Sequence, residues 1–526
     1  MAGKPLRPAI LLVADRTLSA DYKVLFEGIF GTMQTTHVPE LAMRLLVSPK
    51  MPADPEGRAK AAPLGIRRVE SALLAAGLTP DQVACATPES AGRLLGPWTR
   101  IVGVSSSDPL GGGMSNTTTT AFWEGRLYTA HWMDRLTARL RQAKDKFGFV
   151  MVGGGAGAWQ WERNAQRAIE QGFDIVFQGC FEAGGPELFK QLLAGRTPGQ
   201  GDAALAGLEL TTKGKLLLAR QRRSAVELIA PIRGPSALGV IETSRGCGNG
   251  CRFCAAGLQR MEHLAVEAIL ADLRVNAAGG RSAVVSSSED FFRYGGSGGR
   301  VNFPALCDLL EAMRQVEPLD FMQIDHANIC SLLQFSTQEL AEVRRLLRWR
   351  KHSDYLWVNM GVESANGLLV AANAPGKFGP FRAEDWEDMV MQAASRMTES
   401  GFFSVFSLVL GLPGETPDDV RRTHRLVDRL SRERAVIFPV FYEPIRAGER
   451  AFGLAEMTLE HLELYQACYE INFRWVPRLY WDNQRAGGVS LGKRLLVRAL
   501  GGQEVRAWRS HFRRLRRRLT QPAGRA

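Results

Sequence analysis

Between residues 240 and 442, short apolar runs alternate with stretches whose apolar positions recur at helical spacing. Six runs have the length of buried strands, and amphipathic stretches such as Leu264–Ala277 and Thr337–Trp349 lie between them. The expected strands are Val240–Thr243, Ala283–Ser287, Phe321–Asp325, Leu356–Gly361, Ser404–Gly411 and Ala435–Tyr442. Strands that alternate with helices in this way predict a parallel βα barrel, with an active site at the carboxyl ends of the strands.

The first two hundred residues show a similar alternation but form a separate unit. The expected strands are Ala9–Val13, Ile101–Val104, Phe149–Val152 and Asp174–Phe177. With helical segments between them, they predict a Rossmann-like, doubly wound α/β sheet, which binds ligands at the carboxyl ends of its strands. Runs 105–113 and 153–157 lie at such ends, and their glycines let the backbone approach a large ligand closely. Neither run is a GxGxxG followed by an acidic residue, so a dinucleotide site is not favoured.

The length of 526 residues exceeds a single hydrophobic core and predicts several units. We expect a Rossmann-like domain at 1–205, a partly β-structured linker at 206–237, a barrel at 238–445 and a mainly helical region at 446–526. Leu459–Arg478 has helical spacing, and the many aromatic residues in and after it indicate a core, with a lid over the barrel as the alternative. No apolar run is long enough to span a membrane.

The net charge of +12 comes mostly from one end of the chain, because residues 505–526 hold eight arginines and no acidic residue, leaving +4 for the rest. This distribution does not favour a nucleic-acid partner. The segment Trp508–Leu519 has the composition of a basic amphipathic helix, which suits peripheral contact with an anionic membrane. A solvated end of the chain is the alternative.

Three closely spaced cysteines, Cys247, Cys251 and Cys254, form a CxxxCxxC cluster directly after the first expected barrel strand. Three thiolates on one loop suit an iron-sulfur cubane that leaves one iron free for a substrate atom. The other five cysteines form no second CxxC pair, which counts against a zinc ribbon. Ordinary cysteine usage without a signal peptide counts against disulfides and favours a reducing, cytoplasmic compartment.

With an aromatic residue, Phe253, before its last cysteine, the cluster resembles the signature of the radical S-adenosylmethionine (SAM) superfamily. The resemblance implies that the three thiolates hold a 4Fe-4S cluster, that SAM chelates the fourth iron, and that the backbone at Phe253 contacts adenine. It also implies that one electron cleaves SAM to a 5'-deoxyadenosyl radical. Six βα units match the partial (β/α)6 TIM barrel typical of this superfamily.

Two further strand ends correspond to SAM-binding positions of the superfamily. Ser288 and Glu289 follow the second expected strand, where the superfamily commonly has a Gly-Gly-Glu that binds the SAM amino group. Glu363, after the fourth expected strand, resembles a polar position near ribose and methionine. A carboxylate that caps a helix or forms a salt bridge is the alternative for Glu363.

The segment 95–195 resembles the cobalamin-binding domain that precedes the barrel in one branch of the superfamily. The resemblance implies cobalamin contacts at Ser105, Ser106, Asp108, Gly153, Gly154 and Gly155. The motif Asp-x-His-x-x-Gly, which supplies a histidine ligand to cobalt in many cobalamin proteins, is absent from this chain. Bound cobalamin would therefore lack that ligand, and a domain that holds no cofactor is the alternative.

The resemblance favours a cobalamin-dependent C-methyltransferase that acts on an unactivated carbon. The alternatives are a radical cyclisation, rearrangement or carbon-carbon bond-forming enzyme without cobalamin, and a non-enzymatic iron-sulfur or corrinoid sensor. Candidate catalytic or substrate-contacting residues at strand ends, which ordinary hydrogen bonding would also explain, are Tyr294, Asp325, His326, Tyr442 and Glu443. We expect a small-molecule or lipid-like substrate and an electron donor such as flavodoxin or ferredoxin.

Overall fold

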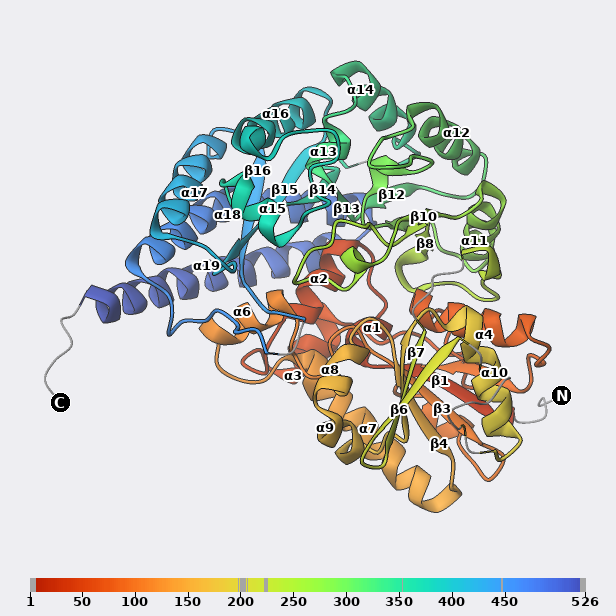
Figure 1. Ribbon diagram of the computed structural model, residues 1–526. Helices are drawn as coiled ribbons and strands as arrows, with labels where there is room; N and C mark the ends of the chain where they lie inside the picture. Colours follow the sequence, from red (N-terminus) through yellow and green to blue (C-terminus); the bar gives the residue numbers. More distant parts are fainter. Residues whose placement is uncertain are drawn as a thin grey trace, which may run out of the picture.

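A computed structural model describes residues 6–520 apart from 197, 199–204, 206, 222–225, 352 and 446–447, so the end of the arginine-rich tail lies outside the described residues. Figure 1 shows an N-terminal α/β unit, in red to yellow, against a second α/β unit in green to light blue. Two long C-terminal helices, in blue, run along the second unit. The predicted α/β class and its mainly helical C-terminal region are confirmed.

The N-terminal unit is built on a seven-stranded sheet in the order β2-β1-β3-β4-β5-β7-β6, in which only β6 is antiparallel to its neighbour. Its strands are β1 (Ile10–Ala14), β2 (Val83–Ala86), β3 (Ile101–Ser105), β4 (Val150–Gly154), β5 (Ile175–Gly179), β6 (Leu208–Lys213) and β7 (Leu216–Gln221). The four predicted strands are confirmed. The short strand β2 was not predicted, and β6 and β7 lie in the stretch predicted as a partly β-structured linker.

Helices cover both faces of this sheet, which explains its continuous apolar strands. Leu11 and Val13 of β1 belong to a core with α7, whereas Ile10 and Leu12 belong to a core with α4 and α10. The principal helices are α1 (Arg16–Ser19), α2 (Leu25–Met33), α4 (Leu64–Ala75), α6 (Met114–Phe122), α7 (Tyr128–Phe147), α8 (Ala158–Arg163), α9 (Ala165–Glu170) and α10 (Phe181–Leu193). The sheet is therefore doubly wound, as predicted.

The second unit contains the six predicted βα repeats, and its strands form two adjoining parallel sheets. The first sheet has the order β12-β11-β8 and the second the order β13-β14-β15-β16. The strands are β8 (Val240–Glu242), β11 (Ala283–Ser287), β12 (Phe321–Ile324), β13 (His326–Ala327), β14 (Trp357–Glu363), β15 (Phe403–Leu410) and β16 (Ala435–Phe441). Asp325 alone separates β12 from β13, and no pairing among the described strands joins β8 to β16, so the barrel is partial.

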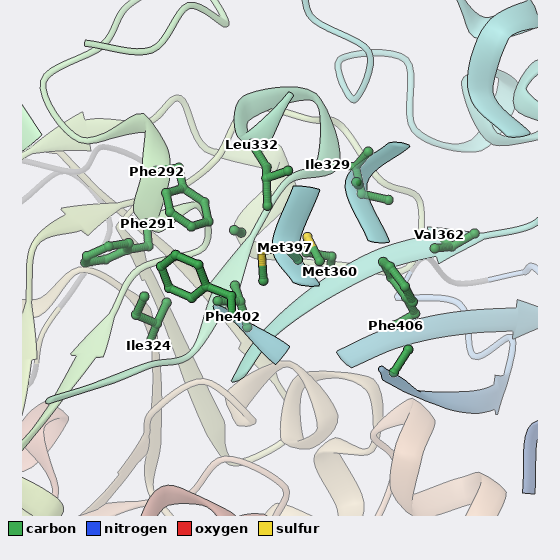
Figure 2. Packing of buried hydrophobic residues seen from close by; sticks show 14 of the residues in the cluster. Phe291, Phe292, Ile324, Ile329, Leu332, Met360, Val362, Met397, Phe402 and Phe406 are labelled. Carbon is green, nitrogen blue, oxygen red and sulfur yellow. The ribbon is translucent and has the colours of Figure 1, made fainter. Parts of the chain in front are cut away.

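Helices surround this barrel, and one apolar core fills the space between helices and strands. The helices are α11 (Val266–Ala278), α12 (Phe303–Arg314), α13 (Ile329–Leu332), α14 (Thr337–Leu346), α15 (Gly367–Asn373), α16 (Trp386–Glu399) and α17 (Pro417–Leu430). Figure 2 shows part of this core, where the rings of Phe291, Phe292 and Phe402 meet beside Met360 and Met397. These side chains are fully buried and hold the strand ends in place.

The C-terminal helices α18 (Leu459–Ala486) and α19 (Leu491–Thr520) cover the open side of the barrel. Asn472 of α18 accepts a hydrogen bond from the backbone N–H of Ile437 at 2.8 Å and donates one to its C=O at 2.7 Å. These bonds occupy the outer edge of β16 and take the place of a seventh strand. Tyr465 is 1% exposed and stacks on Tyr469, so these aromatic residues of α18 form a core.

Candidate functional site

A cavity of about 950 Å³ lies between the two units, bounded by strand ends of both. The N-terminal sheet contributes Ser105, Gly153, Gly154, Gly155 and Gly179, and the barrel contributes Arg245, Ser288 and Glu289. The carboxyl ends of two parallel sheets therefore face each other across one space. The sequence patterns of the two units did not indicate that the predicted cobalamin and SAM sites would lie on one cavity.

The predicted cobalamin contacts divide into two groups. Ser105, Gly153, Gly154 and Gly155 line the cavity. Gly155 has φ of +94°, and a Cβ there would lie 2.6 Å from Ser105 Oγ, so the close approach of two loops requires glycine.

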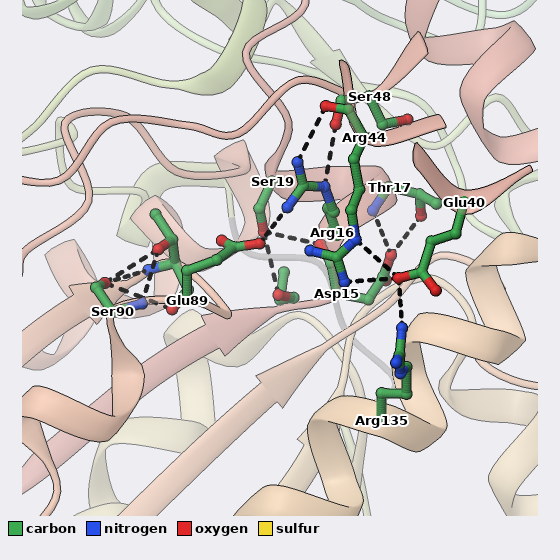
Figure 3. Close-up of polar contacts among 12 residues, drawn as sticks. Asp15, Arg16, Thr17, Ser19, Glu40, Arg44, Ser48, Glu89, Ser90 and Arg135 are labelled. Atoms are coloured by element: carbon green, nitrogen blue, oxygen red, sulfur yellow. Dashed lines mark hydrogen bonds and ion pairs between the residues drawn. The ribbon is translucent and has the colours of Figure 1, made fainter. Parts of the chain in front are cut away.

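Ser106 and Asp108 instead hold the loop after β3. Both are buried, and Ser106 donates to Asp15 Oδ2 at 3.1 Å, while Asp108 accepts from the backbone of Gly113 at 3.0 Å and from the amides of Asn116 and Gln160. Figure 3 shows the polar contacts around Asp15 and Arg16 at the end of β1. These contacts fill the edge of the sheet beside β1, and the cavity lies over β3, β4 and β5.

The three cluster cysteines lie on a loop that the short antiparallel strands β9 (Ser244–Arg245) and β10 (Glu262–His263) close at its base. Backbone hydrogen bonds hold the loop: Cys247 donates to Gln259 at 3.1 Å, and Gly250 donates to Gly257 at 2.8 Å. A further bond from Arg252 to Asn373, at 3.0 Å, joins it to α15. Cys247 is 8% exposed and Cys251 is 7% exposed, and Cys254 is half-buried.

Burial dominates the electrostatics of these thiols. It raises the pKa of Cys247 to about 11 and that of Cys251 to about 12, and the other cluster thiols add to both shifts. The thiols therefore keep their protons at neutral pH until a metal displaces them. In the described part of the chain, no three His, Cys, Asp or Glu side chains converge on one metal ion.

A buried ion pair lies beside the cluster loop. Lys377 Nζ contacts Glu363 Oε1, and both side chains are 6% exposed. Glu363 ends β14 with φ of +61°, a backbone conformation that is costly for a residue with a side chain. Burial lowers the pKa of Lys377, but the charges of Glu363 and Cys251 outweigh it and raise the pKa above its ordinary value. No sequence pattern indicated Lys377, because it lies on a loop outside any motif.

Glu289, Asp325 and His326 come together at the ends of neighbouring strands. Asp325 Oδ1 lies 2.9 Å from His326 Nδ1, and both side chains keep about a third or more of their surface exposed. Surrounding protein lowers the pKa of His326, but the charge and hydrogen bond of Asp325 and the charge of Glu289 raise it to about 9. His326 is therefore an imidazolium at neutral pH, held beside the carboxylate of Asp325.

The remaining predicted residues have other partners. The hydroxyl of Tyr294 donates to the backbone of Leu264 at 2.9 Å, and the hydroxyl of Tyr442 contacts Glu449. Phe253 packs edge-on to Tyr442, with ring centroids 6.4 Å apart. Glu443 is half-buried, which raises its pKa. The roles of these residues, and of Ser288 beside Glu289, stay predictions.

One charged network joins the two units at the cavity wall. Arg245 of β9 forms two hydrogen bonds with Glu182 of α10, at 3.1 and 3.0 Å, and two with Glu242 of β8, at 2.7 and 2.9 Å. Arg68 of α4 adds ion pairs with Glu242 at 3.3 Å and with Asp272 of α11 at 2.6 Å. Burial raises the pKa of Glu242, but the two arginines outweigh it and hold the pKa below its ordinary value.

Residues 241–427 match a family model described as the Radical SAM superfamily. The chain carries a radical SAM domain. The match runs from β8 to α17 and contains the cysteine loop, Ser288, Glu289 and Glu363. The predicted radical SAM domain is confirmed over these residues.

Curated relatives of this chain are distant. The ribosomal protein uS12 methylthiotransferase RimO of Protochlamydia amoebophila is 21% identical over 273 residues, which cover 50% of this chain and 53% of that protein. The tRNA-2-methylthio-N(6)-dimethylallyladenosine synthase of Aromatoleum aromaticum is 22% identical over 258 residues, 47% of this chain and 51% of that protein. The chain thus spans about half the length of the curated relatives it matches.

Solved structures of similar fold cover both units. TsrM from Kitasatospora setae, a radical SAM methyltransferase solved with tryptophan substrate and a SAM analogue, matches with a TM-score of 0.54 at 15% identity. The match covers 83% of this chain and 74% of that chain. The structure of TsrM with cobalamin and a 4Fe-4S cluster matches with a TM-score of 0.53, also at 15% identity, and covers 83% of this chain and 77% of that chain. This likeness establishes the fold.

Proposed function

We propose that this radical SAM enzyme is a cobalamin-dependent methyltransferase that methylates an unactivated carbon of a small-molecule or lipid-like substrate. The observation that carries the proposal is the shared cavity, in which the glycine-lined ends of β3, β4 and β5 face the cysteine loop. This cavity has a volume of about 950 Å³, and its glycine-lined strand ends let a large ligand approach the backbone closely. TsrM, which shares the fold, has been solved with cobalamin and a cluster bound.

The residues present fit these cofactors. Cys247, Cys251 and Cys254 offer two buried thiols and one half-buried thiol for a 4Fe-4S cluster, and Ser288 and Glu289 face the same cavity for SAM. Among the described residues that line the cavity there is no histidine, so these residues offer cobalt no imidazole. When bound, the cluster and SAM supply a 5'-deoxyadenosyl radical and the corrinoid carries the methyl group.

The chain's own residues then bind and orient the cofactors and shield them from solvent. The charged network of Arg245, Glu182 and Glu242 fixes the two halves of the cavity relative to each other. His326, protonated at neutral pH, can hold or release a proton at Nε2 while Asp325 fixes its ring through Nδ1. An external one-electron donor such as flavodoxin or ferredoxin would supply the electron.

The test uses two variants that separate the cofactors. Gly154 lines the cavity, and a Cβ there would meet only Phe177 O at 3.6 Å, so Gly154→Leu fills the cavity without backbone strain. After anaerobic purification with cobalamin supplied, we expect Gly154→Leu to keep iron but lose cobalt. We expect Cys247→Ala to lose iron, whereas Cys307→Ala, at a half-buried cysteine outside the loop, keeps it.

Activity decides between the proposal and its alternatives. With methyl-labelled SAM and a strong reductant, the wild type should form 5'-deoxyadenosine, and cell extract should contain a product with labelled methyl groups. Full iron with no cobalt in the wild type would overturn the methyltransferase and leave a radical cyclisation, rearrangement or bond-forming reaction. No 5'-deoxyadenosine above the Cys247→Ala level would overturn catalysis and favour a sensor.

A further inference from the structure

One half of the surface of α19 is fixed against the protein. Trp508 is 7% exposed and Phe512 is 3% exposed, and both pack against Phe122 and against Tyr465 and Tyr469 of α18. Leu515 and Leu519 also join this core. The apolar residues of the arginine-rich segment therefore face the protein and are not available to a membrane.

A different set of apolar residues faces outward in the first half of α19. Leu491, Leu495, Leu496 and Leu500 are 56%, 53%, 45% and 43% exposed. At 3.6 residues per turn these four leucines spread over one half of the helix surface, and Trp508 and Phe512 lie on the opposite half. From 491 to 503 the outward half holds only these leucines and Gly492, Ala499, Gly502 and Gln503. We call Leu491, Leu495, Leu496 and Leu500 the leucine face.

The outward half changes character in the second half of the same helix. It carries exposed arginines at 506, 509, 513, 514, 517 and 518. Arg509 pairs with Glu470 of α18 at 2.8 Å. Glu504 is the one acidic residue of α19, and helical spacing places it on the inner side near Trp508. An uncharged apolar stretch and a strongly basic stretch thus follow each other along one straight surface.

The apolar and basic stretches of α19 together determine which partner can cover the outward half of this helix. A second copy of the chain would bring arginines against arginines in a parallel pairing, or arginines against leucines in an antiparallel one, and the outward half offers no carboxylate to relieve either. An anionic bilayer supplies both complements, because its headgroups attract the arginines and its acyl region accepts the leucines. No described helix is long and apolar enough to cross a membrane, so contact through α19 would be peripheral.

We propose that the outward half of α19 docks the protein on an anionic phospholipid surface, with the leucine face inserted between headgroups and the exposed arginines on lipid phosphates. The geometry differs from that of an amphipathic helix with apolar and basic faces on opposite sides, since here they follow each other along the helix axis. This docking is independent of the cofactors, so the protein without cofactors is a suitable sample.

Vesicle sedimentation of the full chain tests the proposal. We expect binding to vesicles of phosphatidylcholine and phosphatidylglycerol that high salt weakens, and little binding to phosphatidylcholine alone. Arg513→Gln with Arg517→Gln should weaken binding at least tenfold, since each arginine near an anionic surface contributes about fivefold. Leu495→Gln with Leu500→Gln should also weaken it at least tenfold, because two apolar side chains no longer leave water.

Matched variants remove the same groups elsewhere. Arg345→Gln with Arg350→Gln lowers the net charge by the same amount on an exposed part of the barrel, and Leu228→Gln with Leu368→Gln removes two exposed leucines elsewhere. Both should bind like the wild type, and circular dichroism should show every variant folded. Failure of the wild type to bind anionic vesicles overturns the proposal, as does equal weakening by the matched arginine variant. A wild-type dimer that Leu495→Gln with Leu500→Gln converts to a monomer also overturns it, because a second copy would then cover the leucine face.

Discussion

At the scale of single residues, the charge of His326 depends on one neighbour. Without Asp325, burial lowers the pKa of the imidazole and only Glu289 opposes it. We expect Asp325→Asn to lower the pKa of His326 from about 9 by more than one unit, measured by NMR of the protein labelled at histidine. Asp428→Asn removes a carboxylate from α17 and should leave this pKa unchanged.

The same shift predicts a pH dependence of stability. The folded pKa lies above the unfolded value of about 6.5, so the contribution is complete below that pH and is lost as pH rises through about 9. The melting temperature of the wild type should therefore fall more between these pH values than that of Asp325→Asn. Parallel curves for the two proteins would show that His326 is not held as an imidazolium.

At the scale of elements, the edge of the barrel depends on a side chain of α18. Asn472→Ala leaves the buried N–H and C=O of Ile437 without partners. Because a buried unpaired polar group costs about 1–3 kcal/mol, we expect the free energy of unfolding to fall by about 2–4 kcal/mol in urea denaturation.

An exposed position on the same helix gives the control. Glu470→Ala removes only a surface ion pair with Arg509, so the free energy of unfolding should fall by less than about 1 kcal/mol. Equal effects of the two variants would mean that Asn472 does not protect the edge of β16. The sequence indicated helix α18 by its periodicity, but the pairing with a strand thirty-five positions away carries no local signal.

At the scale of the whole molecule, Arg245 holds the two units together at the cavity. In Arg245→Leu the carboxylate of Glu182 loses the cation it shares with Glu242, and two buried negative charges face the cavity. We expect faster hydrogen exchange in α10 and β8, and at least tenfold weaker binding of cobalamin with unchanged iron content.

Arg196→Leu, at an exposed arginine of the N-terminal unit, should change neither quantity. The exchange measurement stands even if the protein binds no corrinoid. Unchanged exchange in α10 after loss of Arg245 would show that the network does not couple the units.

The elements and the three-cysteine loop were accessible from the chain alone because their signals are local. Apolar runs buried on both faces predicted ten strands of the two parallel units, and cysteine spacing predicted Cys247, Cys251 and Cys254. The edge strand β2 escaped because four small residues, Val-Ala-Cys-Ala, give a weak pattern. The inward or outward direction of the apolar residues in α19 also escaped, since it depends on Phe122 and Tyr465 from distant elements.

The sequence by itself determined that the chain has two parallel α/β units and a three-cysteine loop after the first barrel strand. Only the tertiary structure decided that the strand ends of both units bound one cavity, that Lys377 pairs with Glu363, and that Arg245 joins the units. The physical reason is the distance along the sequence over which each feature is encoded. Helical and strand periods and ligand spacing are encoded over a few residues, whereas a buried charge finds its partner through packing that brings together residues tens to hundreds of positions apart.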